Sequence, residues 1–68
     1  MDVLEKLGWV KEKHLTYDRY VEKVNNGHGE YIDKRSITVY VNGEVYLPNY
    51  LTKEELYALY KIVKEITI

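Results

Sequence analysis

The chain has 68 residues, of which 46% are hydrophobic and 31% charged, and its 10 Lys and Arg nearly balance its 11 Asp and Glu. Because it contains no cysteine, disulfide bonds and thiolate metal ligation are excluded. The net charge of −1 lacks the basic excess of a dedicated nucleic-acid-binding protein. A chain this short builds only one small core, so residues 1–68 are expected to form a single domain.

The sequence carries no targeting signal that its composition would reveal. No apolar run approaches the length of a membrane span. The first six residues are too acidic and too poor in apolar side chains for a signal peptide. We therefore expect a cytoplasmic protein without a membrane partner.

A short helix is expected directly after the N-terminus. Asp2 can cap it, Glu5 stands three residues later as in a capping box, and Gly8 suits the position after its end. A helix this short must dock to persist, and its apolar side chains are Val3, Leu4 and Leu7. Trp9 is expected in the core at this junction.

Residues 10–24 read as two strands with a turn near 14–16. The charged run 11–13 suits a sheet edge, where charge discourages pairing with another chain. Two Asn and two Gly in the segment 25–29 then predict a tight reversal.

The chain returns as a strand over residues 30–41, which 33–36 interrupt as a bulge or a second turn. Its second half alternates most clearly, with Ile37, Val39 and Val41 on one face. At Asn42-Gly43 a two-residue turn would pair Val39 with Tyr46. A three-residue loop would instead oppose Val41 to Val45 and Val39 to Leu47. We expect the latter, because it places all these aliphatic side chains on one buried face.

The clearest element is an amphipathic helix near the C-terminus. Thr52 and Glu55 form a capping box, and Leu51 and Leu56 are spaced as a hydrophobic staple. A stripe at helical spacing is expected to face the sheet, with Ile62 at its edge; it comprises Leu56, Leu59, Tyr60, Val63 and Ile66. The predicted fold class is α+β: a short N-terminal helix, an antiparallel meander of about four strands, and this helix on one face of the sheet.

Sequence patterns for catalysis and metal binding are weak. His14 and His28 lack ligand spacing, and Ser36, the only serine, has no nucleophile motif around it. Neighbouring Lys and Arg explain the carboxylates of the central segment as cross-strand ion pairs. We expect no enzyme, no metal and no cofactor.

The eight tyrosines leave two interpretations open. Tyrosine is common on wetted antiparallel faces, and it is also enriched at interaction surfaces. The expected binding residues, on the sheet face away from the helix, are Tyr40, Tyr46, Thr38, Tyr20 and Tyr17. We expect this face to bind another protein or a second copy of the chain as a homodimer. The alternative is a nucleotide or single-stranded nucleic acid stacked on the same tyrosines.

The run Leu-Glu-Lys-Leu-Gly-Trp at 4–9, the Tyr- and charge-rich middle and the run from Tyr50 to Leu56 resemble short orphan proteins of phages and prophages from AT-rich hosts. That resemblance implies a compact, non-enzymatic protein of the host cytoplasm. Some such proteins inhibit host defence or housekeeping proteins by occupying a surface. The resemblance assigns no functional residue.

Overall fold

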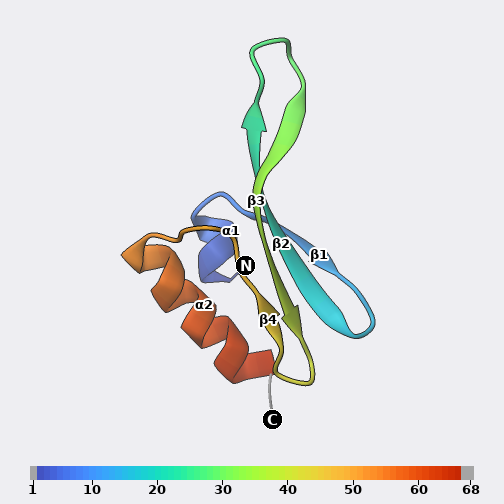
Figure 1. The fold of residues 1–68 in the computed structure, drawn as a ribbon, viewed down its shortest axis with the longest axis vertical. Coiled ribbons are helices and arrows are strands. Elements are labelled where there is room, and N and C mark those ends of the chain that lie inside the picture. The colour runs from blue at the N-terminus through green and yellow to red at the C-terminus, as the bar shows by residue number, and fades with distance from the viewer. Residues whose placement is uncertain (1, 67–68) are drawn as a thin grey trace.

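A computed structural model describes residues 2–66. Its elements are, in chain order, α1 (Val3–Lys6), β1 (Val10–Lys13), β2 (Tyr17–Asn25), β3 (Tyr31–Tyr40), β4 (Val45–Tyr46) and α2 (Lys53–Ile66). The four strands form one antiparallel sheet in the order β1-β2-β3-β4, a simple meander. Both helices lie on one side of it (Figure 1). The predicted α+β class, with a short helix, four strands and a helix packed on the sheet, is confirmed.

Both helices begin with the predicted capping boxes. In α1 the Asp2 carboxylate accepts the Glu5 amide N–H at 3.0 Å, while the Glu5 side chain accepts the Asp2 N–H at 3.2 Å. In α2 the Thr52 hydroxyl accepts the Glu55 N–H at 3.2 Å, and Glu55 accepts the Thr52 N–H at 2.8 Å. Gly8 follows α1 with a φ of 101°, a conformation that favours glycine at a helix end.

The core lies between the two helices and the inner face of the sheet. Leu4 of α1, Trp9, Ile37 and Val39 of β3 are all buried, so the expected docking of α1 and the burial of Trp9 are confirmed. The remaining buried members of this cluster are Tyr20, Ala58, Leu59 and Ile62. Such burial supplies most of the favourable free energy of folding in a chain without disulfides.

The buried face of α2 is rotated from the predicted stripe. Leu59 is buried and Val63 and Ile66 pack against the core, as expected. Leu56 is 51% and Tyr60 61% exposed, however, and Ala58 and Glu55 take the inward positions. Two features explain the rotation. The small side chain of Ala58 lets α1 pack against α2, and Arg35 of β3 binds the Glu55 carboxylate.

Arg35 of β3 ties α2 to the sheet. Its guanidinium donates to both carboxylate oxygens of Glu22 at 2.7 and 2.8 Å, to both oxygens of Glu55 at 2.9 and 2.7 Å, and to the Tyr50 carbonyl at 3.2 Å. The guanidinium carbon also lies 5.0 Å from the centre of the Trp9 ring and 4.8 Å from that of Tyr50. Charge is thus buried here with its hydrogen bonds satisfied, as a low-dielectric site requires.

Glu55 is the centre of this network. Besides the two bonds from Arg35, its carboxylate accepts the Thr52 N–H and, at 3.1 Å, the Trp9 indole N–H. Burial alone would raise the pKa of Glu55, but these hydrogen bonds from Arg35, Thr52 and Trp9 outweigh it and lower the pKa to about 2. The hydrogen bond from Arg35 likewise lowers the pKa of Glu22.

The β3–β4 turn has a register that neither sequence alternative gave. Val39 pairs with Val45 and Thr38 with Tyr46, so the loop holds three residues, 41–43, and starts one residue earlier than expected. The reason is Gly43, whose φ is 96°. A three-residue loop needs a left-handed conformation at its last position, and the predicted loop would have placed Glu44 there. Val41, expected in the core, therefore lies in the turn and is 52% exposed.

The β2–β3 hairpin extends beyond the rest of the domain (Figure 1). Its tip is the predicted reversal, where the Asn25 and Asn26 side chains accept the Gly27 and His28 N–H groups at 2.8 Å each. The register shifts between Glu22 and Lys23, which identifies the predicted interruption of the returning strand as a bulge.

Candidate interaction surface

The outer face of the sheet, away from the helices, carries four of the five predicted binding residues. Tyr17 pairs with Tyr40 and Thr38 with Tyr46 across the sheet, while Ile37 and Val39, which alternate with Thr38 and Tyr40, enter the core. The placement of Tyr20 on this face was wrong. Tyr20 is 1% exposed, pairs with Ile37 on the inner face and donates its hydroxyl to Asp2 at 2.6 Å. Strand alternation separates it from Tyr17, three residues away.

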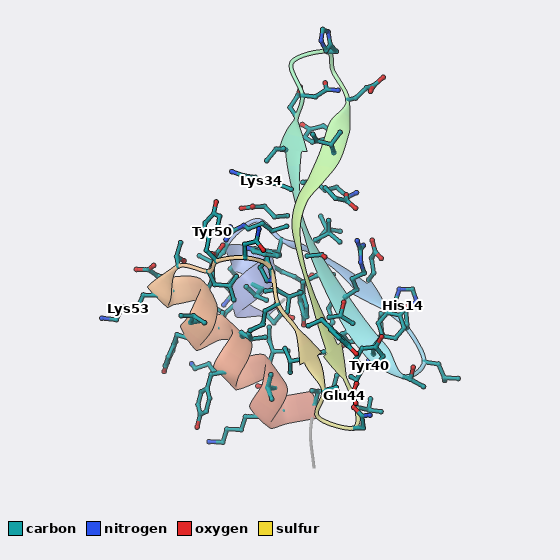
Figure 2. All side chains as sticks on the ribbon, in the orientation of Figure 1. His14, Lys34, Tyr40, Glu44, Tyr50 and Lys53 are labelled. Atoms are coloured by element: carbon teal, nitrogen blue, oxygen red, sulfur yellow. The ribbon has the colours of Figure 1, made fainter. Side chains whose placement is uncertain are left out.

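Four rings form a continuous row across the outer face, running from the end of β1 to β4. His14 stacks on Tyr17 with ring centres 4.4 Å apart. Tyr17 contacts Tyr40 at 5.2 Å, and Tyr40 meets the edge of Tyr46 at 5.6 Å. All three distances lie in the range of favourable aromatic pairing. His14 and Tyr40 are labelled in Figure 2 near one end of the sheet.

Two apolar side chains on the adjoining turns extend this surface. Leu15, in the β1–β2 turn, is 97% exposed, and Val41 lies in the β3–β4 turn. The Val41 N–H donates to the Thr16 carbonyl at 3.0 Å, which holds the two turns side by side. Sequence reasoning missed both residues. For Leu15 the sequence did contain a signal: a leucine occupies a two-residue turn, where glycine, asparagine or aspartate is preferred.

We call this surface the outer-face patch; it consists of His14, Leu15, Tyr17, Tyr40, Val41 and Tyr46. Carboxylates stand at both of its ends. Glu12 lies 3.6 Å from His14 Nε2, and Glu44 accepts the Tyr46 hydroxyl at 3.4 Å. The neighbouring cation, Arg19, is paired with both Glu12 and Asp33. The patch is therefore aromatic and apolar, and among residues 2–66 its border carries one carboxylate without a basic partner, that of Glu44.

The carboxylates in the middle of the sheet are engaged in ion pairs. Among residues 2–66, no group of three or more His, Asp or Glu side chains could hold a metal ion. The central carboxylates make the cross-strand ion pairs expected from the sequence, among them Glu22 with Arg35 and Asp33 with Lys23. The hydrogen bond from Lys23 lowers the pKa of Asp33, as an ion pair does. Within the same residues, neither helix is long and apolar enough to cross a membrane.

Comparisons with known proteins add no assignment. No protein-family model, curated protein or solved structure matches this chain. Function has to be inferred from the surface itself.

Proposed function

We propose that this protein is a non-enzymatic binding module whose outer-face patch docks onto another protein. The observation that carries the proposal is the aromatic row, which lies beside two turns that carry the exposed apolar residues Leu15 and Val41. Tyrosine and apolar side chains clustered at a surface provide the anchors from which protein interfaces draw most of their binding energy.

The charges around the patch favour a protein over a nucleic acid. Binding of a phosphate backbone rests on free Lys and Arg side chains. Here the unpaired flanking carboxylate among residues 2–66 is Glu44, and the nearby Arg19 is neutralised by Glu12 and Asp33. A polyanion would be repelled from the surface on which its bases would have to stack. Nucleotide or single-strand binding is therefore the weaker alternative.

The same charges favour a partner other than a second copy. In a two-fold dimer the patch would face itself, and Glu44 would meet a patch whose neighbouring cation, Arg19, is already paired with Glu12 and Asp33. An opposite charge on a different protein would complement Glu44. A surface-occupying inhibitor of the phage type suggested by the sequence would work in this way, without any chemistry of its own.

The experiment is a comparison of two matched double variants. Tyr40→Ala/Tyr46→Ala removes two rings of the row, and Tyr57→Ala/Tyr60→Ala removes two exposed tyrosines on α2. Tagged wild type and both variants are used to capture proteins from the native host, and each captured protein is purified and its affinity measured by calorimetry. Circular dichroism checks that all three chains are folded.

The proposal predicts one partner that binds wild type and the α2 variant equally, and the row variant at least about tenfold more weakly. A partner that binds all three chains equally would refute it. Light scattering of the purified chain tests the homodimer alternative. If the wild type is a dimer and Tyr40→Ala/Tyr46→Ala is a monomer, the partner is a second copy of this chain and not a different protein. Titration with oligothymidylate at low salt tests the nucleic-acid alternative. If the wild type binds it and Tyr40→Ala/Tyr46→Ala does not, the partner is a nucleic acid and not a protein.

A further inference from the structure

Glu44 and Tyr46 form an incomplete ion-pair site at one end of the outer-face patch. Glu44 is exposed, and among residues 2–66 its carboxylate has only the Tyr46 hydroxyl as a partner, at 3.4 Å. Glu22, Glu55 and Asp33, in contrast, all have a basic partner. Tyr46 is 58% exposed, so part of its ring is open to a ligand. An aromatic ring and an unpaired carboxylate therefore lie together at one accessible place, where Figure 2 labels Glu44 and Tyr40.

This chain already holds cations between aromatic rings and carboxylates: Lys11 lies 5.8 Å from the centre of the Tyr20 ring and is paired with Asp2 and Asp18, and Arg35 is held by more groups. The Arg35 guanidinium lies near the Trp9 and Tyr50 rings, at 5.0 and 4.8 Å, while the carboxylates of Glu22 and Glu55 bind its N–H groups. A planar guanidinium can place its face on an aromatic ring and direct its N–H groups at a carboxylate simultaneously. A lysine ammonium lacks this planar face. Tyr46 and Glu44 offer the same two components on the surface.

We infer that the outer-face patch recognises an arginine side chain of its partner, with the guanidinium on the Tyr46 ring and paired with the Glu44 carboxylate. This inference rests on the proposed function and names the chemistry of the partner. The partner is a different protein, because the chain has only two arginines. Arg19 is bound by Glu12 and Asp33, and Arg35 is bound in the interior.

The direct test uses a defined probe and the full chain. The probe is an acetylated, amidated pentapeptide in which valines flank a central arginine. It is titrated into the isotope-labelled protein, and the amide shifts of the protein are followed by NMR. Its twin carries citrulline, which has nearly the shape of arginine but no charge. We expect the arginine peptide to shift the amides of Val41, Glu44 and Tyr46, and the citrulline peptide to bind about fivefold to tenfold more weakly. Equal affinities, or no shifts at these amides with about 5 mM peptide, would overturn the inference.

Two charge variants separate this inference from the proposed function. Glu44→Gln should lower the affinity of the arginine peptide to that of the citrulline peptide, whereas Glu54→Gln, at an exposed carboxylate on α2, should leave it unchanged. With the captured partner, loss of binding in Tyr40→Ala/Tyr46→Ala but full binding in Glu44→Gln would refute arginine recognition and leave the proposed function standing. Full binding in both would refute the proposed function itself.

Discussion

Replacing Arg35 by methionine should destabilise the fold more than any other single change at a charged residue. Methionine fills much of the same volume but leaves Glu22 and Glu55 facing each other without a cation. The side chains of Arg35 and Glu55 are only 9% and 8% exposed, so water cannot replace the lost bonds easily. Removing one partner of a buried ion pair costs about 3–5 kcal/mol. A domain of this length has a total stability of roughly 3–10 kcal/mol, so the variant is expected to be marginal at neutral pH.

The pH dependence of stability distinguishes Arg35→Met from the wild type more clearly than the loss of stability itself. In the wild type the pKa of Glu55 is depressed, so its contribution to stability is present above pH 4.5 and is lost as the pH falls toward 2. Without Arg35, burial and the neighbouring Glu22 oppose the two remaining hydrogen bonds from Thr52 and Trp9, and we expect them to raise the pKa of Glu55 above its ordinary value. Stability is then highest with the group protonated and falls as the pH rises. The variant should therefore become more stable between pH 7 and pH 5, where the wild type changes little.

Urea denaturation followed by Trp9 fluorescence measures both effects, because the indole N–H is bonded to Glu55 and its environment changes on unfolding. The control is Lys23→Met, which removes an exposed ion pair with Asp33 and should cost less than about 1 kcal/mol. The reasoning is refuted if Arg35→Met costs no more than this control. A variant that loses stability on acidification from pH 7 to pH 5 would refute it equally.

Three further changes test other parts of the structure. Glu55→Gln should remove much of the acid dependence of the wild type, which is up to about 3 kcal/mol in the free energy of unfolding between pH 4.5 and pH 2. Urea titrations at both pH values would show that stability depends less on pH in the variant. An unchanged pH dependence would contradict the lowered pKa of Glu55. Tyr20→Phe deletes the hydroxyl bonded to Asp2 and should lower stability by about 1 kcal/mol in a thermal melt, whereas no loss would mean that this bond contributes nothing. Gly43→Ala places a side chain at a φ of 96° and should cost about 1–2 kcal/mol by the same melt; a neutral effect would contradict the register of the β3–β4 turn.

The elements of the fold could be predicted from the sequence because their signals are local. The capping boxes at Asp2 and Thr52 involve residues three apart, and the reversal at 25–29 depends on its own Asn and Gly. Each of these was confirmed.

The errors concern interactions between residues far apart in sequence. The rotation of α2 follows from Arg35 and Trp9, 20 and 46 positions from the Glu55 that they bind. Hydrophobic periodicity treats a glutamate as a solvent-facing residue, so it could not place Glu55 inside. The turn register failed for a different reason: burial of aliphatic side chains was weighted above the left-handed conformation that Gly43 supplies.

The candidate surface was predicted in part. Strand alternation placed Thr38, Tyr40 and Tyr46 on one face, Tyr17 was also expected there, and the structure adds His14 to them. Alternation could not decide between Tyr17 and Tyr20 without the register of β2. Leu15 and Val41 became part of the surface only when the contact between their two turns was known.

Hydrogen–deuterium exchange of the captured complex tests the outer-face patch most directly, because it maps the bound surface without any substitution. Binding through the patch predicts slower exchange over residues 14–17 and 40–46 in the complex than in the free chain. Unchanged exchange is predicted over the exposed face of α2 and at the β2–β3 tip. Slower exchange confined to α2 or to residues 25–31 would contradict the account and assign binding to another surface.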